Sequence, residues 1–512
     1  MFEHLRRLAT TGAAYTAASV LSKLIALFLL PIYTTYLSPA DYGAAEVMLA
    51  SLVAASIVVR LGVIEAILRF YYGAGEREEA VVRTGFASLF WTTTVAALVA
   101  LPFAGPISEA LLSERDAGLA RLAILGLWHL TLWEYVLTLL RLDERARTYF
   151  TYTIVQVLLT IPVTVALVVG TGLGPSAILL GSFGTGVLFL LGRLWVERRR
   201  LGLRVDTGLL RRMLRFGLPT MPAELTLYSL SFIDRIIIVR LAGLAEAGLY
   251  ALAVKFANGM QVLVRGFHLA WPPLAYSIAD DDEARRAYAL IVSWFVATIA
   301  FAVVGLWLLA PWLVRLLADD RFFEAQDVVG PLAAGTALYA LYLVLVVILG
   351  RTGRTELSFP ATLTAVVVNI GLNLLLVPEY GIIGAGVALG ASYVVVVGLM
   401  YAIVRRLFPV PYEWRRLAIA VALAGALIAV GETLVPHDGA DGFALTLALC
   451  AAYPAGLWAA RFLTDEERER LGALLARVRG KEASARREVG EREAQAEAAI
   501  DQATRDTDRG GN

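Results

Sequence analysis

The chain has 512 residues, of which 58% are hydrophobic and only 17% are charged, and its mean hydropathy is +0.69. An ordinary soluble domain has about a quarter charged and roughly half apolar residues, so this composition excludes a soluble globular protein. The apolar residues form continuous runs, such as residues 13–37, that exceed the ~20 residues a helix needs to cross a bilayer. Because the runs are continuous, and are not the ~10-residue segments of alternating apolar and polar residues that form membrane strands, the sequence predicts an all-α polytopic membrane protein.

The charged residues and the cysteine content exclude several functions. Only three basic residues are lysines (Lys23, Lys255 and Lys481), and none of them lies in a glycine-rich phosphate loop, which excludes an ATP site. No basic soluble stretch is interleaved with aromatic residues, so a nucleic-acid partner is excluded. The single Cys450 lies in an apolar run and the four histidines have no metal-ligand spacing. We therefore expect neither a metal site nor a cofactor.

Fourteen apolar runs, each bounded by charged residues, proline or glycine, are expected to be transmembrane helices. Their length and continuity are typical of such helices. In chain order the predicted spans cover residues 10–36, 43–70, 84–112, 118–140, 149–170, 174–195, 214–240, 247–278, 287–314, 328–350, 357–377, 382–404, 414–434 and 442–463.

Basic residues alternate strictly between the loops that join these spans. The N-terminal segment and every second loop hold 23 arginines together, whereas the intervening loops hold four. The four arginines of the second set are Arg115, Arg121, Arg315 and Arg321. Because cytoplasmic loops carry an excess of Lys and Arg, the alternation predicts that both termini are cytoplasmic.

An internal repeat relates the two halves of the chain. A shift of 205 residues superposes the first two spans on spans seven and eight, and a shift of 210 superposes span six on span twelve. The matched pairs are Asp41 with Glu246, Gly43 with Gly248, Arg60 with Arg265 and Tyr71 with Tyr276 for the first shift, and Gly174 with Gly384 for the second. Because six spans is an even number, both halves enter the membrane in the same sense, and the repeat is parallel. The alternative is coincidence among helices rich in small residues.

The repeat predicts the domain organisation. Residues 1–200 form an N-terminal six-helix bundle, residues 201–408 form a C-terminal six-helix bundle, and the two face one another around a central cavity. Residues 409–463 add two extra transmembrane helices. Residues 464–512 carry twelve acidic and ten basic residues with few large apolar ones, which is typical of a charged, largely disordered cytoplasmic tail.

Three sequence stretches resemble a known family. Residues 29–43 (LLPIYTTYLSPADYG) resemble the first hairpin of the O-antigen-type, lipid-linked oligosaccharide flippases that act in polysaccharide biosynthesis. Residues 231–238 and 248–255 resemble the start of the second half of these proteins, and residues 369–386 resemble their C-terminal signature. The family belongs to the multidrug/oligosaccharidyl-lipid/polysaccharide (MOP) exporter superfamily, and the resemblance covers roughly residues 5–463.

The resemblance implies a transporter of the bacterial inner membrane and not an enzyme. It would move undecaprenyl-diphosphate-linked oligosaccharide or polysaccharide repeat units from the cytoplasmic to the outer leaflet by alternating access, among membrane lipids and near glycosyltransferases and a polysaccharide polymerase. Two alternatives remain in the same superfamily, a cation-coupled drug antiporter and a peptidoglycan lipid II flippase. A membrane glycosyltransferase or polymerase needs a large outer loop for its catalytic groups, and the predicted outer loops are short.

Charged residues within the spans are the candidate functional residues, because an intramembrane charge is costly unless it faces a cavity or a partner. A lipid-linked diphosphate needs cations to replace its hydration. Lys23, about 20 Å along the first span, together with Arg60, Arg265 and Lys255, is therefore predicted to bind the diphosphate. The alternative is that these cations pair internally.

Span seven carries a polar stripe of Glu224, Tyr228, Ser231 and Arg235 at helical spacing. Tyr228 and Ser231 suit sugar hydroxyls and are predicted to contact the glycan. Glu224 or the neighbouring Asp234 is predicted to take H⁺ or Na⁺ and couple transport to an ion gradient. The alternative is that these side chains form buried contacts between helices.

Glu65 and Arg69 lie four residues apart in the second span. This spacing places the two side chains on one face of a helix. We predict that they form a structural ion pair.

Overall fold

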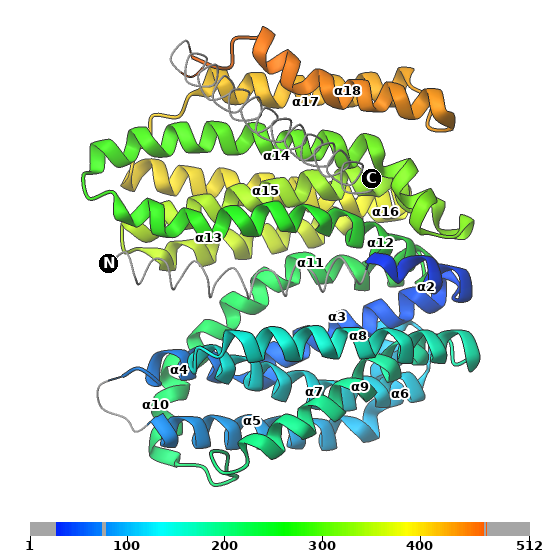
Figure 1. The fold of residues 1–512 in the computed structure, drawn as a ribbon, viewed down its shortest axis with the longest axis vertical. Helices are drawn as coiled ribbons and strands as arrows, with labels where there is room; N and C mark the ends of the chain where they lie inside the picture. Colours follow the sequence, from blue (N-terminus) through cyan, green and yellow to red (C-terminus); the bar gives the residue numbers. More distant parts are fainter. Residues whose placement is uncertain (1–26, 74–77, 465–466, 468–512) are drawn as a thin grey trace, which may run out of the picture.

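The computed structural model describes residues 27–73, 78–464 and 467. Within these residues every regular element is a helix (Figure 1). Eleven helices or continuous helical segments are long and apolar enough to cross a membrane. The described part of the chain is therefore the all-α membrane fold that the composition predicts.

The N-terminal lobe contains the helices up to α9, which lie together in the lower half of Figure 1. Its helices are α2 (Leu30–Tyr36), α3 (Pro39–Arg60), α4 (Val63–Phe70), α5 (Glu78–Ala100), α6 (Ala104–Leu112), α7 (Ala117–Leu142), α8 (Ala146–Gly170) and α9 (Pro175–Glu197), with the 3₁₀ turn η1 (Leu101–Phe103) between α5 and α6.

The C-terminal lobe lies above the N-terminal lobe in Figure 1, and two further helices cover its outer side. The linker helix α10 (Thr207–Gly217) and the turn η2 (Leu218–Thr220) lead into the lobe. Its elements are α11 (Met221–Leu241), α12 (Leu244–Ala257), η3 (Asn258–Met260), α13 (Gln261–Ser277), α14 (Asp281–Leu317), η4 (Asp320–Ala325), α15 (Gln326–Arg351), η5 (Thr355–Leu357) and α16 (Ser358–Leu407). The two further helices are α17 (Trp414–Leu434) and α18 (Gly439–Ala459).

Thirteen of the fourteen predicted spans correspond to helices. α16 contains two spans, because Gly381 interrupts it with φ 54° and ψ −135°. α11 is the predicted seventh span, but its four charged residues exclude it from the eleven apolar segments. The first span, 10–36, lies mostly outside the described residues, which contain only its last part, including α2.

Local sequence explains where the second span begins and ends. Ser38 caps α3, since its hydroxyl accepts from the backbone N–H of Asp41 at 3.1 Å and the Asp41 carboxylate accepts from the backbone N–H of Ser38 at 3.2 Å. The predicted continuous helix over 43–70 is wrong at one point. Leu61 and Gly62 are left-handed, with φ of 51° and 68°, and they divide it into α3 and α4.

The backbone carries the internal repeat. Gly174 before α9 has φ 55° and ψ −133°, and Gly381 within α16 has φ 54° and ψ −135°. A carboxylate lies beside each glycine, because a Cβ on Gly174 would lie 3.4 Å from Asp41 and a Cβ on Gly381 would lie 3.7 Å from Glu246. The structural equivalent of Gly174 is therefore Gly381. The predicted match with Gly384 was displaced by three residues, because the kink falls before that glycine.

We call the end of the molecule that holds residues 142–146, 198–206, 278–280 and 352–354 the arginine-rich end. The opposite end, with residues 113–116, 171–174, 242–243, 318–319 and 435–438, is the arginine-poor end. The lobes approach each other toward the arginine-poor end, at the right of Figure 1, where α3 packs against α12.

Helices α3 and α12 cross at the repeat-related Gly43 and Gly248. A Cβ on Gly43 would lie 2.2 Å from the carbonyl oxygen of Leu244, and a Cβ on Gly248 would lie 1.9 Å from that of Pro39. Only glycine fits such an approach between two backbones. The lobes are thus in backbone contact at this crossing.

Two arginines join the lobes at the arginine-poor end. Arg240 of α11 donates to the carbonyl oxygen of Ala110, at the end of α6, at 2.5 Å. Arg321 of η4 donates to the carbonyl oxygens of Thr34 and Thr35, at the end of α2, at 2.8 and 2.9 Å. Each guanidinium therefore binds the negative C-terminal end of a helix in the opposite lobe.

Helices α17 and α18 pack against α14 of the C-terminal lobe (Figure 1). Tyr453 of α18 donates to the carbonyl oxygen of Ala297 of α14 at 3.1 Å. Arg416 of α17 pairs with Glu467 at 3.0 Å. Apart from Thr464 and Glu467, the predicted tail 464–512 lies outside the described residues.

Candidate functional site

A cavity of about 510 Å³ lies between the two lobes. Helix α3 supplies its wall on the N-terminal side, and α11, α12, α13, α15 and α16 supply its wall on the C-terminal side. Both halves of the repeat therefore contribute side chains to one enclosed site. The charged side chains that line it are Arg60, Glu224, Arg235 and Arg265.

Three guanidinium groups meet in this cavity. Arg60 lies at the end of α3, Arg235 in the second half of α11 and Arg265 at the start of α13. Arg265 is close enough to Tyr149 of α8 and Tyr339 of α15 to interact with both electrostatically. Arginine suits anion recognition, because its planar donors match the oxygens of carboxylates and phosphates.

Glu224 is the partner of Arg60 across the lobes. Its carboxylate accepts from Nη2 of Arg60 at 2.8 Å, and Nε of Arg60 donates to the carbonyl oxygen of Ser56 at 3.3 Å. The structure therefore brings together two predicted site residues, but as an ion pair with each other. This is the internal pairing that the sequence left open for Arg60.

Asp234 belongs to a different environment, the interior of the C-terminal lobe. It is fully buried and accepts hydrogen bonds from the Tyr250 hydroxyl at 2.9 Å and from the Asn373 amide at 2.8 Å. The side chain of Asn369 also lies close enough to act on the Asp234 carboxylate. The amide oxygens of Asn369 and Asn373 have no hydrogen-bond donor among the described residues. The cluster thus presents a carboxylate and unsatisfied amide oxygens, the oxygen ligands that hard cations prefer.

The predicted glycan residues are only partly described. Tyr228 lines the cavity, and its hydroxyl donates to the carbonyl oxygen of Ala50 in α3 at 3.0 Å. Ser231 belongs to α11, but its side chain lies outside the described part of the structure, and Lys23 lies outside the described residues altogether. Tyr250, Tyr339 and Tyr393 add further aromatic side chains to the cavity wall.

The structure does not bring Lys255 into the cavity wall. Its ammonium group pairs with Glu46 of α3 at 2.8 Å. The physical reason is the close crossing of α3 and α12, which places a lysine of one lobe against a carboxylate of the other. Lys255 thus joins the lobes in this conformation.

The predicted Glu65–Arg69 ion pair is not formed. The Arg69 guanidinium lies over the ring of Phe216, 4.3 Å from the ring centroid, and no ion pair joins it to Glu65. Helix α10 brings Phe216 alongside α4, and the cation–π contact replaces an exposed ion pair that would contribute little to stability.

Arg235 is the cavity residue that the prediction of the site omitted. The signal was present, since Arg235 continues the polar stripe of Glu224 and Tyr228 along one face of α11. Its neighbour in sequence, Asp234, faces the lobe interior instead. The stripe placed Arg235 on the face of Glu224 and Tyr228, but the sequence alone did not reveal that this face lines the cavity.

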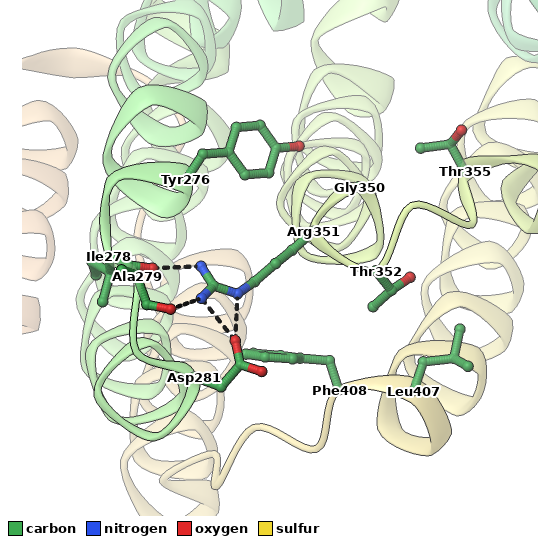
Figure 2. A pocket seen from close by; sticks show the side chains of 10 residues that line it. All are labelled: Tyr276, Ile278, Ala279, Asp281, Gly350, Arg351, Thr352, Thr355, Leu407 and Phe408. Atoms are coloured by element: carbon green, nitrogen blue, oxygen red, sulfur yellow. Dashed lines mark hydrogen bonds and ion pairs between the residues drawn. The ribbon is translucent and has the colours of Figure 1, made fainter.

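A second pocket, of about 830 Å³, lies at the arginine-rich end of the C-terminal lobe. Figure 2 shows Arg351 beside Asp281 and the backbone of Ile278 and Ala279. The guanidinium donates to the Ile278 carbonyl at 2.8 Å, the Ala279 carbonyl at 3.2 Å and the Asp281 carboxylate at 2.8 Å. Because protein atoms already occupy its donors, this arginine holds the loop between α13 and α14 in place.

A charge network also fixes the arginine-rich end of the N-terminal lobe. Arg200 donates to the Asp143 carboxylate at 2.6 Å, and the Tyr71 hydroxyl donates to it at 2.9 Å. Burial alone would raise the pKa of Asp143, but the hydrogen bonds from Arg200 and Tyr71 outweigh it and hold that pKa below its usual value. The network joins the loops that precede α8 and follow α9.

Solved structures with a similar arrangement of helices show the fold of the chain. The chain is similar to a structure titled lipid II flippase MurJ in an inward closed conformation, with 13% identity, a TM-score of 0.70, and coverage of 87% of this chain and 98% of that one. It is also similar to an inward-facing multidrug resistance MATE family transporter of the MOP superfamily, with 18% identity, a TM-score of 0.60, and coverage of 76% and 98%. The chain therefore shares the fold of these two structures.

Sequence comparison identifies the family. The family described as polysaccharide biosynthesis protein matches residues 34–327, more than half of the chain, and the protein belongs to this family. A curated relative, the succinoglycan biosynthesis transport protein ExoT of Rhizobium meliloti (strain 1021), is 30% identical over 173 residues. That match covers 31% of this chain and 35% of the relative, so the chain spans about a third of the length of the curated relative it matches.

Proposed function

We propose that the protein is a flippase for polyprenyl-diphosphate-linked oligosaccharides that supply polysaccharide biosynthesis. The observation that carries the proposal is the convergence of Arg60, Arg235 and Arg265 in one cavity between the two lobes. A diphosphate leaving water loses its hydration, and guanidinium groups replace it with charge-assisted hydrogen bonds. Membership in a polysaccharide biosynthesis family supports a glycan as the rest of the headgroup.

Transport follows from rocking of the lobes about the cavity. The backbone contact of Gly43 with Gly248 and the bonds of Arg240 and Arg321 close the arginine-poor end. When these contacts break and the arginine-rich ends of the two lobes approach each other, the cavity opens at the arginine-poor end. Because basic loops are cytoplasmic, the headgroup moves from the cytoplasmic leaflet to the outer leaflet of a bacterial inner membrane, and both termini are cytoplasmic.

The ion-coupling residue in this proposal is Asp234. Its full burial and its hydrogen bonds from Tyr250 and Asn373 support a site for H⁺ or Na⁺, whereas Glu224 is engaged with Arg60. Binding a cation at Asp234 removes an uncompensated charge from the lobe interior, where such a charge is costly. Glycosyltransferases that make the substrate and a polymerase that uses it are the partners this reaction requires.

The two alternatives from the superfamily differ in substrate. A drug antiporter for cations needs an acidic cavity, whereas the carboxylate of Glu224 is outnumbered by three arginines in this one. A lipid II flippase shares the diphosphate and differs in the glycan. Likeness of fold to both classes does not discriminate between them, so the test must compare substrates directly.

The test uses the full-length protein in proteoliposomes. A fluorescent polyprenyl-diphosphate oligosaccharide, lipid II and a cationic dye are offered to the same preparation. We expect translocation of the oligosaccharide lipid only, and its loss in Arg60→Gln and Arg265→Gln variants that insert and fold normally. Movement of the dye alone, or unchanged oligosaccharide transport in both variants, overturns the proposal.

A further inference from the structure

Two consecutive residues of α11 have opposite surroundings. Asp234 points into the C-terminal lobe, where it is fully buried and bonded to Tyr250 and Asn373. Arg235 lines the cavity between the lobes. Neighbouring residues of a helix are about 100° apart around its axis, so their side chains point in different directions although their backbone atoms are adjacent. The two charged groups are therefore close to each other even though one faces the lobe interior and the other faces the cavity. The two side chains interact electrostatically.

Arg235 differs from the other cavity arginines in its hydrogen bonding. Arg60 is held by Glu224 at 2.8 Å, and Arg265 also has an interaction partner. Among the described residues Arg235 forms no hydrogen bond, and its Nε is buried without a partner. A buried guanidinium donor without an acceptor is costly, so the arrangement favours an anionic ligand in the cavity.

We propose that Arg235 is the guanidinium on which the diphosphate of the substrate docks, and that the charge on Asp234 behind it sets the strength of that docking. The proposal rests on the proposed function and describes how binding of the cation at Asp234 and binding of the diphosphate at Arg235 affect each other. When Asp234 is ionised, its charge partly neutralises Arg235. When Asp234 holds H⁺ or Na⁺, the full positive charge of Arg235 is available to the diphosphate.

The sign of the coupling follows directly. A cation at Asp234 strengthens binding of the anionic headgroup, and by reciprocity the headgroup strengthens binding of the cation. The two ligands therefore bind together. Arg235 would instead repel a cationic drug in the same cavity. A cation bound at Asp234 would strengthen this repulsion, so the drug and the cation would compete.

The other groups near Arg235 do not supply this switch. Tyr42 of α3, Tyr228 of α11 and Tyr250 of α12 interact with it electrostatically, and tyrosines stay neutral at physiological pH. Glu46 of α3 also acts on Tyr42, but its charge is compensated by Lys255 at 2.8 Å. Tyr393 of α16 acts on Tyr250 and is likewise neutral. Glu224 lies on the same helix, but its charge is compensated by Arg60 at 2.8 Å. Asp234 is therefore the carboxylate of α11 whose charge changes when a cation binds.

The experiment measures binding of farnesyl diphosphate to the full-length protein in nanodiscs, with farnesol as the control that lacks phosphate. Na⁺ is varied against choline at constant pH and ionic strength. We expect Na⁺ to tighten binding to wild type at least about fivefold, within the usual range of coupling between two sites. Asp234→Asn, which carries no charge, should bind as tightly without the cation as wild type does with it.

A double-mutant cycle assigns the coupling to Arg235. Arg235→Gln should weaken binding about tenfold or more, and adding Asp234→Asn to it should give no gain. The matched control is Arg60→Gln, in which binding is weaker but the gain from Asp234→Asn remains. Arg235→Lys keeps the charge and should keep the cation dependence, which distinguishes charge coupling from a structural role. If Asp234→Asn fails to fold, the cation titrations of wild type, Arg235→Gln and Arg235→Lys decide the same question.

The outcomes separate this inference from the proposed function. Unchanged affinity in Arg235→Gln, or an equal gain from Asp234→Asn with and without Arg235, overturns the inference while diphosphate binding stands. If wild type binds farnesyl diphosphate no better than farnesol, diphosphate recognition itself is refuted. A loss of affinity on adding Na⁺ reverses the predicted sign and overturns the coupling.

Discussion

The crossing of α3 and α12 makes a quantitative prediction about the resting conformation. In a Gly248→Ala variant the new methyl carbon would lie 1.9 Å from the carbonyl oxygen of Pro39. Carbon and oxygen atoms of neighbouring helices approach to about 3.3 Å, so the two helices must separate by about 1.4 Å. Both atoms belong to or adjoin backbone, so no flexible side chain is available to give way.

The energetic consequence is a shift between conformations. Inserting a methyl group into a packed interface costs about 1–3 kcal/mol, which corresponds to roughly a 5- to 150-fold change in an equilibrium constant. The cost applies only to the conformation in which the arginine-poor end is closed. We therefore expect Gly248→Ala to raise the population in which the lobes are separated at that end.

Distances between spin labels test this shift. Cysteines are placed in a Cys450→Ser background at Leu173 and Tyr380, two exposed positions at the arginine-poor ends of the two lobes. Gly248→Ala should lengthen the distance distribution and slow transport. The matched control is Gly371→Ala, since a Cβ at Gly371 meets no atom within 4 Å. Identical distances and rates in the two variants would refute the reasoning.

Three further predictions concern single contacts. Replacing Arg240 and Arg321 together by alanine removes the hydrogen bonds from both arginines to helix ends. This double variant should increase chemical labelling of cysteines placed in the cavity from the arginine-poor side. Alanine replacements of exposed arginines at the arginine-rich end should not have this effect. Asp143→Asn should lower the thermal unfolding midpoint at pH 7. Because the folded pKa of Asp143 is depressed, its stabilisation is fully present above the unfolded value near 4 and is lost as the pH falls through the folded pKa, so a gap that does not narrow as the pH falls below 4 contradicts the assignment. Arg351→Ala removes the hydrogen bonds to partly buried and exposed carbonyls of the α13–α14 loop and should cost about 1–2 kcal/mol of stability without changing diphosphate affinity of the folded protein. Lost affinity at full stability would instead make the pocket of Figure 2 a binding site.

The class of fold follows from the amino-acid sequence alone. Inside a bilayer each backbone N–H and C=O must be satisfied within its own segment, so a continuous apolar run of sufficient length can form only a helix. This is why thirteen predicted spans correspond to helices with small shifts at their ends. The repeat was also readable, because Gly43 and Gly248 are required wherever two backbones touch.

The pairing of the intramembrane charges, in contrast, depends on how the helices pack in three dimensions. The partners of Arg60 and Lys255 are Glu224 and Glu46, which are far away in the sequence and belong to the opposite lobe. Such pairs depend on how two lobes dock, and helices that are apolar nearly all round give no periodicity from which docking can be read. Local spacing misled at Arg69, where a ring on another helix competed with the carboxylate four residues away.

The same limit applied to the site. Arg60 and Arg265 were found because they occupy equivalent positions of the repeat, a property of the sequence. Arg235 was passed over because its role depends on the rotation of α11, which turns Asp234 into the lobe and Arg235 into the cavity. Rotation of a helix about its axis is set by packing against α3, α12 and α16, and this information exists only in the folded molecule.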